Sequence, residues 1–219
     1  FQAEVFKQLL LELGCTFDPV VTLDNTDFYT ALAESDVDLW VNGWFPLHDQ
    51  FLTDPMIRSN TERIGSQVRG GALQGYLIDK RTADRLDINS LDDLRDSAIG
   101  DYTALMSDVL RRFQNQEPIL FYTWTPNWTI GRLVPGIDVV WIEVPFSSLP
   151  DSMAPQADST EISVEGCVAD PCNLGFPPND IQVVANKQFL EHGPTQRLLE
   201  QVRIPLDDIA SQNTLMFDG

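Results

Sequence analysis

The sequence is short of cysteine, of cations and of long apolar runs, and each shortage excludes a class of protein. Three cysteines in 219 residues are too few for a scaffold built on disulfides. No apolar run approaches the ~18 residues that a membrane-spanning helix needs, and no signal peptide is recognisable. Only 14 Lys and Arg stand against 33 Asp and Glu, a net charge of -19. Nucleic acids and anionic membranes are therefore disfavoured as partners, because phosphate binding needs clustered cations.

The acidic balance itself has three interpretations that the sequence leaves open. It fits a cationic ligand, a high-salt setting, or a charged surface that only keeps the protein solvated. The chain is 43% hydrophobic over 219 residues. That content is enough for a sizeable core, in one large domain or in two small lobes.

The cysteines indicate a local bridge and no metal site. Cys167 and Cys172 bracket Val-Ala-Asp-Pro in a polar stretch, so we expect a disulfide between them in an oxidising compartment. Without further Cys or His nearby the spacing is poor for zinc, and no metal or cofactor is predicted. Cys15 follows a predicted helix end and is expected to be a buried free thiol.

Apolar periodicity alternates between helical and extended segments, which predicts an α/β fold with a parallel sheet. A lobe of this class normally opens with a strand, so the start at Phe1 indicates that upstream residues are missing. Residues 145–179 show no period and form a long excursion. Helices are expected at 1–13, 26–34, 80–86, 90–95, 102–113, 191–202 and from 126 and 205, and extended segments at 16–23, 37–41, 70–78, 118–124, 137–144 and 181–186.

Two extended runs end in Trp followed by Pro. Trp44 closes the first, in the segment 38–49, and Trp124 closes the second, in the segment 121–128. Open α/β sheets place ligand contacts at strand ends, so a shared aromatic pocket is one interpretation. The other is that both residues are core anchors, the commoner fate of Trp. The remaining candidates for lining a cleft are Trp40, Asn42, Pro46, Tyr122 and Thr123.

The other aromatic and histidine residues have simpler interpretations. Trp128 and Trp141 are expected to be packing residues. The position of Trp40 fits a place in the cleft wall, but a core role is favoured. His48 followed by Asp49 suggests an acid/base pair of a hydrolase, but adjacent side chains usually point apart and no nucleophile elbow accompanies them. His192 has only a solvated interpretation.

Five motifs, in order along nearly the whole chain, closely resemble the glycine betaine/proline betaine-binding proteins of ABC importers. The resemblance implies a two-lobed periplasmic-binding-protein fold of type II with two crossover segments. The motifs are Asn42-Gly-Trp-Phe-Pro-Leu-His48-Asp49, Gln74-Gly-Tyr-Leu-Ile-Asp-Lys80, Phe121-Tyr-Thr-Trp-Thr-Pro-Asn-Trp128, Asp138-Val-Val-Trp-Ile-Glu-Val-Pro-Phe146 and Val183-Val-Ala-Asn-Lys187.

The resemblance also implies a domain division and a site. One lobe comprises residues 1–71 and 187–219, and the other comprises 72–186 with the crossovers. In this family Trp faces enclose a quaternary ammonium group, and a His with backbone amides takes the ligand carboxylate. Trp44 and Trp124 match positions in the aromatic box, and His48 matches the carboxylate-binding His.

The sequence departs from the family at the third Trp of the box. Family members carry it in a loop that contains Gly and Cys, whereas here Ala98-Ile-Gly-Asp101 runs straight across. Either a segment near residues 99–100 is missing from the sequence, or the protein lacks it. In the second case the box is open on one side.

The resemblance implies a non-catalytic extracytoplasmic receptor, expected to be monomeric, that hands a betaine to ABC permease subunits. An alternative keeps the fold and changes the ligand to choline or to a sulfonium zwitterion such as dimethylsulfoniopropionate. A remote alternative, from a different class, is an enzyme that acts on a quaternary amine through His48.

Overall fold

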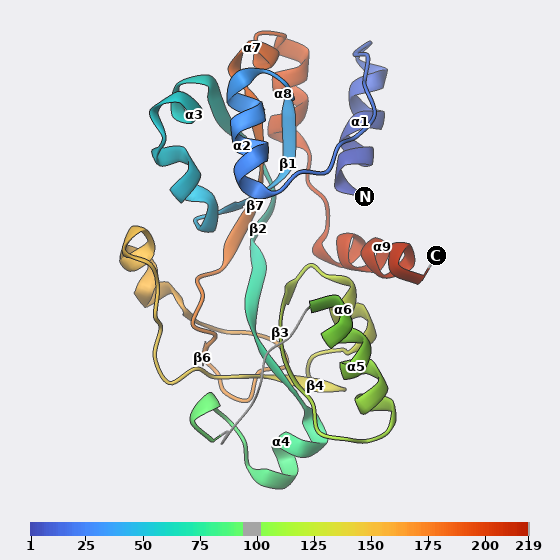
Figure 1. Ribbon diagram of the computed structural model, residues 1–219, viewed down its shortest axis with the longest axis vertical. Helices are drawn as coiled ribbons and strands as arrows, with labels where there is room; N and C mark the ends of the chain where they lie inside the picture. The colour runs from blue at the N-terminus through green and yellow to red at the C-terminus, as the bar shows by residue number, and fades with distance from the viewer. Residues whose placement is uncertain (94–101, 219) are drawn as a thin grey trace. The chain divides into compact units, whose positions relative to one another are not determined.

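The computed structural model describes residues 1–93 and 102–218, and the chain divides into two compact units (Figure 1). Unit 1 comprises Phe1–Ala72 and Asn179–Ile209, and unit 2 comprises Leu73–Pro178 and Ala210–Gly219. The segment expected to be missing near residues 99–100 lies outside the described residues. Within the described ranges, no helix has the length and apolar character needed to cross a bilayer.

Helices and strands alternate along both units, and short 3-10 helices are labelled η. In chain order the elements are α1 (Gln2–Glu12), α2 (Asn25–Glu34), β1 (Leu39–Phe45), η1 (Leu47–Thr53), α3 (Pro55–Asn60), β2 (Thr61–Asp79), α4 (Lys80–Leu86), η2 (Leu91–Asp93), α5 (Tyr102–Gln114), β3 (Leu120–Thr125), α6 (Trp128–Arg132), β4 (Val139–Ile142), η3 (Asp151–Ser159), β5 (Glu161–Ile162), β6 (Cys172–Asn173), β7 (Asn179–Asn186), α7 (Lys187–Leu190), α8 (Gly193–Gln201) and α9 (Leu206–Asp218).

The sheet of unit 1 is built around β7. This strand lies between β1 and the first part of β2 and is antiparallel to both. β1 and β2 therefore run in the same direction, and the chain passes between them through η1 and α3. Figure 1 shows the three strands with α2 alongside them.

Unit 2 repeats this arrangement with different strands. The second part of β2 lies between β3 and β4 and is antiparallel to both. β3 and β4 consequently share a direction, and α6 connects them. Each unit thus holds a β–α–β crossover whose two strands are separated by a strand from elsewhere in the chain.

The expected parallel sheet is wrong for neighbouring strands. Every pairing between named strands of the described residues is antiparallel. The helix and strand alternation correctly predicts that the strands of each crossover run the same way. It does not predict the inserted strand, because local periodicity carries no information about which distant segment pairs between them.

The core of unit 1 lies between α2 and the sheet. Asp24 caps α2 by accepting a hydrogen bond from the backbone N–H of Asp27 at 3.0 Å, which satisfies one of the free donors at the helix start. Tyr29 and Leu32 of the helix are fully buried against Val184 of β7. The helix face that points into the core is thus set by residues three apart.

Both faces of the unit 2 sheet are covered, so its strands are apolar on both sides. Leu77, Phe121 and Trp141 of β4 belong to one core cluster. Ile78 and Ile142 belong to a second cluster, on the other side of the same strands. The alternation of neighbouring residues between two clusters follows from the two-residue period of a strand.

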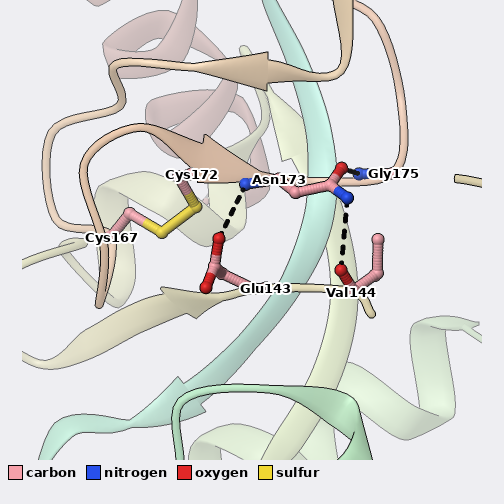
Figure 2. Close-up of a disulfide and its surroundings, with 6 residues drawn as sticks. All are labelled: Glu143, Val144, Cys167, Cys172, Asn173 and Gly175. Atoms are coloured by element: carbon pink, nitrogen blue, oxygen red, sulfur yellow. Dashed lines mark hydrogen bonds between the residues drawn. A yellow bond between two sulfur atoms is a disulfide. The ribbon is translucent and has the colours of Figure 1, made fainter. Parts of the chain in front are cut away.

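The excursion after β4 is attached to the unit 2 sheet. Its β5 and β6 form a two-stranded antiparallel pair, and a disulfide joins Cys167 and Cys172 with their Cα atoms 6.4 Å apart (Figure 2). The backbone N–H of Trp141 donates to the carbonyl oxygen of Gly166 at 2.9 Å. The disulfide-closed turn is therefore an extension of the sheet at β4.

Two local expectations differ from the structure. Residues 15–24 form no helix or strand, whereas the sequence predicts an extended segment at 16–23. A run becomes a strand only when it is hydrogen-bonded to a neighbour, and no described strand pairs with this one. Cys15 is free but only partly buried.

The unit boundaries also differ from the expected lobe boundaries. β7 belongs to unit 1, because it pairs with β1 and with the part of β2 in that unit. The last residues belong to unit 2, where Phe217 stacks on Trp128 with ring centroids 3.7 Å apart. Neither contact is visible in the local sequence pattern.

We predict that replacing both Cys167 and Cys172 by Ser lowers the free energy of unfolding by about 2 kcal/mol, because the open loop regains conformational entropy when unfolded. Urea titration followed by circular dichroism measures the loss. A reducing agent provides the control: it should lower the stability of the wild type and leave the double variant unchanged. Equal stability of the two proteins under oxidising conditions would contradict the prediction.

Candidate functional site

The turn after β1 brings Trp44 and His48 together within unit 1. The strand ends at Phe45, and the chain continues through Pro46 into η1. The backbone N–H of Leu47 donates to Asn179 Oδ1 at 3.0 Å, which ties the turn to the first residue of β7. The site residues are therefore positioned by a strand and a turn that both contact the central strand of the sheet.

A bulge in β1 allows both of its faces to be buried at this end. The register against β7 shifts between Trp40 and Gly43, and Gly43, Trp44 and Phe45 are all buried. A Cβ atom on Gly43 would lie 2.8 Å from the Phe45 ring and 3.1 Å from the Gln182 carbonyl oxygen, so a larger residue would clash. Glycine lets β1 and β7 approach closely at the bulge.

His48 is held by hydrogen bonds and rings from three elements. The backbone N–H of Trp44 donates to His48 Nδ1 at 3.1 Å, and the hydroxyl of Tyr29 lies 3.3 Å from the same nitrogen. The Trp40 ring stacks on the imidazole at 5.3 Å, and Phe51 contacts its edge at 5.6 Å. Only 4% of the residue is exposed.

These contacts fix the tautomer and charge of His48. A backbone N–H can only donate, so Nδ1 must accept and the proton of the neutral ring lies on Nε2. Burial lowers the pKa of His48 to about 4, because the charged form loses its hydration. At neutral pH the side chain is therefore a neutral imidazole with a single N–H donor.

Trp44 and Trp40 have different environments. Trp44 is buried, and its indole N–H donates to Asn42 Oδ1 at 3.0 Å, so its one polar atom is satisfied by an exposed neighbour. Trp40 stacks on Phe28 at 4.7 Å as well as on His48. Trp40 is thus a packing residue that supports the imidazole. Pro46, the residue after β1, is half-buried.

In unit 2, Trp124 belongs to an aromatic surface on one face of β2 and β3. Gln74 pairs with Trp124 and Tyr76 with Tyr122, and side chains two apart on a strand share a face. The Tyr122 ring lies 5.8 Å from Tyr76, 6.3 Å from Trp124 and 5.9 Å from Phe176. We call Tyr76, Tyr122, Trp124 and Phe176 the aromatic surface of unit 2.

Thr123, the remaining sequence candidate of unit 2, lies on the opposite face of β3 from Trp124, because neighbouring residues of a strand alternate between its faces. Thr123 is fully buried, and its hydroxyl lies 2.8 Å from that of Thr129. Trp141 is 2% exposed in the core, and Trp128 packs on Phe217 with nearly parallel rings. Both Trp residues are packing residues in the structure.

The sequence does not identify Tyr29, Gln74 or Phe176 as neighbours of the candidate site residues. Tyr29 lies in a helix with ordinary amphipathic spacing, so nothing local marks it as a partner of His48. Gln74 is identifiable only once the pairing of β2 with β3 is known. Phe176 lies in the excursion, where no periodicity exists to interpret.

An open pocket of about 420 Å³ in unit 1 contains none of the predicted site residues. It forms beside a bulge of β2, and its lining is mostly charged. Arg63, one of its cations, is already paired with Asp49 at 2.8 Å. No group of three or more His, Cys, Asp or Glu capable of holding a metal occurs among the residues the structure describes.

The burial of His48 predicts a loss of stability in acid. Its pKa is about 4 when folded and about 6.5 when unfolded, so the unfolded chain binds the proton more strongly between these values. Stability from this group is complete above the unfolded pKa and falls as the pH drops towards the folded one. We expect a loss of up to about 2 kcal/mol between pH ~7 and pH ~5.

Urea titrations at both pH values of the wild type and of His48→Gln measure this contribution. The variant should lose less stability on acidification than the wild type. His192→Gln is the matched control, because His192 is exposed, and it should behave like the wild type. An identical pH dependence in His48→Gln and wild type would show that the buried imidazole is not responsible.

The chain matches a family described as the substrate binding domain of the ABC-type glycine betaine transport system, over residues 1–101 and 97–219. The two matched stretches meet where the sequence departs from the family pattern. The glycine betaine-binding periplasmic protein OusX of Dickeya dadantii is 32% identical over 264 residues, which cover 100% of this chain and 77% of that protein. The glycine betaine/proline betaine-binding periplasmic protein of Escherichia coli is 31% identical with the same coverage. The aligned span exceeds the 219 residues of this chain, so the relatives carry additional residues within it.

Solved structures share the fold. Lactococcal OpuAC, in a closed conformation complexed with glycine betaine, has a TM-score of 0.68 at 16% identity and covers 99% of this chain and 84% of its own. An ABC-transporter choline binding protein in complex with choline has a TM-score of 0.65 at 14% identity and covers 99% and 78%. These similarities confirm the expected α/β periplasmic-binding-protein fold of type II. With the full-length sequence matches, they show that the chain belongs to the family of substrate-binding domains of ABC-type glycine betaine transport systems.

Proposed function

We propose that this chain is a non-catalytic receptor that binds glycine betaine, or a related quaternary-ammonium zwitterion, and delivers it to the permease of an ABC importer. The observation that carries the proposal is the pairing of Trp44 with a neutral, oriented His48 on one short turn. An indole face suits the cationic end of such a ligand, and an imidazole N–H suits its carboxylate. Family membership and the names of the relatives support the same ligand class.

The cationic end of the ligand requires aromatic faces. A trimethylammonium group has no proton to donate, so a protein binds it chiefly through cation-π attraction and apolar contact. Each face contributes roughly 0.5–2 kcal/mol, depending on how far it is removed from water. We propose Trp44 and Trp124 as ligand-binding residues that offer such faces.

The carboxylate end of the ligand requires a hydrogen-bond donor. His48 Nδ1 is occupied by the Trp44 backbone N–H, so Nε2–H is the donor left for a ligand carboxylate. A hydrogen bond to a charged group contributes about 1.5–3 kcal/mol. Glycine betaine provides both groups, whereas choline, the main alternative ligand, lacks the carboxylate.

An enzymatic role for His48 finds no support in its surroundings. Its neighbour Asp49 pairs with Arg63 at 2.8 Å and not with the imidazole. The ring nitrogen that would act as a base accepts the backbone hydrogen bond of Trp44. We therefore expect glycine betaine to be recovered unaltered, by mass spectrometry, after long incubation with the protein.

The relatives' names also bear on location and partners. Both named relatives are periplasmic proteins, and we propose an extracytoplasmic location for this chain. Its proposed partners are the permease subunits of an ABC importer and a small zwitterionic ligand. Its proposed state is monomeric.

The aromatic contacts are tested by Trp44→Leu and Trp124→Leu, which keep apolar volume and remove the indole face. Each should weaken glycine betaine binding by about 2- to 30-fold, measured by isothermal titration calorimetry. Trp128→Phe is the control, because its ring stacks on Phe217, and its affinity should match that of the wild type. Unchanged affinity in both Leu variants would remove the basis for these ligand contacts.

The carboxylate contact is tested by His48→Phe, which keeps an aromatic ring in the cluster and removes the donor. Glycine betaine affinity should fall by about 10- to 150-fold, while any choline affinity should change little. The ratio of the two dissociation constants separates loss of the carboxylate donor from a general disturbance of the turn. A parallel loss for both ligands would contradict the proposed role of Nε2.

A further inference from the structure

We propose that the open pocket of unit 1 binds a small multivalent oxyanion, a molecule that carries two or more carboxylate or phosphate groups. Its lining includes Arg63, Arg69 and Arg203 but only one carboxylate, that of Glu200, although the whole chain has a net charge of -19. None of these residues is a proposed betaine contact, so the pocket is a separate site within unit 1.

A bulged part of β2 forms one wall of the pocket. The register of β2 against β7 shifts twice between Ile64 and Ala72. Gly65, inside the first bulge, has a φ of 64°, and a Cβ atom there would collide with the carbonyl oxygen of Leu199 in α8. Glycine thus lets β2 lie directly against the end of α8. This close approach brings Arg203, which follows α8, to the arginines of β2.

Two of the three guanidinium groups are held in place by the protein itself. Arg63 Nη1 donates to Asp49 Oδ1 at 2.8 Å, and Arg203 Nη1 donates to two carbonyl oxygens at the end of α8, at 3.0 and 2.8 Å. The other N–H groups of both side chains make no hydrogen bond within the described part of the chain. A donor that is already positioned loses less conformational entropy when a ligand binds.

Arg69 is the cation of the pocket without a partner. Among the residues that the structure describes, its exposed side chain makes no hydrogen bond or ion pair. The nearest acid along the neighbouring strand, Asp180, instead accepts a hydrogen bond from the backbone N–H of Gly70 at 2.7 Å. The second oxygen of Asp180 lies 3.5 Å from the Ser66 hydroxyl. All five N–H donors of Arg69 are therefore available to a ligand.

The charges around the pocket predict that a ligand must be multivalent. Asp49 offsets part of the charge of Arg63, and Glu200 lies in the lining itself. A single exposed ion pair contributes little to binding, because water and salt screen it. An anion with several charged groups engages several arginines at once, and a volume of about 420 Å³ accommodates such a molecule.

Arginine favours oxyanions over other anions. Its planar guanidinium donates two parallel hydrogen bonds to a carboxylate or a phosphate, which a spherical ion such as chloride cannot accept in the same way. Carboxylate and phosphate share this geometry. Citrate and pyrophosphate are therefore the two probes, and the tighter of them identifies the preferred class.

The test is a titration of the ¹⁵N-labelled chain with each probe at constant ionic strength, followed by heteronuclear NMR. Citrate or pyrophosphate should cause saturable shifts of the backbone N–H signals of residues 65–70. Acetate, with one carboxylate, should bind more weakly than either. Arg69→Gln should weaken binding of the tighter probe by about 1.5- to 5-fold, and Arg69→Gln with Arg203→Gln by about 2- to 25-fold.

Two further variants separate the pocket from the overall charge of the protein. Arg58→Gln is the matched control: Arg58 is exposed on α3 in the same unit and lies outside the lining, so its loss should leave affinity unchanged. Glu200→Gln should strengthen binding by about 1.5- to 5-fold, because it removes the carboxylate of the lining. Circular dichroism verifies that each variant folds.

Three results would overturn the assignment. The first is the absence of saturable shifts with both probes. The second is an equal loss of affinity in Arg58→Gln and Arg69→Gln, which would indicate a general charge effect. The third is acetate binding as tight as that of citrate and pyrophosphate. If Arg203→Gln disturbs the end of α8, Arg69→Gln decides alone, because Arg69 is bonded to no described residue.

Discussion

The hydrogen bond from the Trp44 backbone to His48 Nδ1 is the constraint on which the candidate site of unit 1 depends. It places the imidazole, selects its tautomer and leaves one donor on the other nitrogen. The surrounding rings, above all Tyr29 and Trp40, exclude water and so keep the side chain neutral. The same burial raises the pKa of the Tyr29 hydroxyl, which stays protonated beside the ring. Core packing and ligand chemistry are thus properties of the same few residues.

The aromatic rings of unit 2 are also positioned by hydrogen bonds. The Tyr122 hydroxyl donates a hydrogen bond to Gln74. Asn173, three residues before Phe176, bonds to Val144 and Gly175. Rigid placement favours cation-π recognition, because a ring that must reorganise on binding loses part of the binding free energy.

The extent to which sequence predicts this protein depends on how local each feature is. The helix at 80–86 and the strand at the Trp124 corner follow from short-range periodicity and agree with the structure. The strand inserted into each unit does not, because pairing with a segment distant in the sequence leaves no local pattern. Trp44 and His48 are recognisable from their motif. Their hydrogen-bonded partner Tyr29 is not, because its role arises only when α2 packs on the turn.

The central position of β7 has a consequence for biosynthesis. β1 and β2 are translated early, but they do not pair with each other, and the strand that joins them begins only at Asn179. The sheet of unit 1 therefore cannot form until β7 has left the ribosome. Until then the edges of β1 and β2 that pair with β7 have no partner. Closing so long a loop is slow and exposes those edges to wrong partners. A chain organised in this way depends on a strand that begins at Asn179 to complete a sheet whose first strand begins at Leu39.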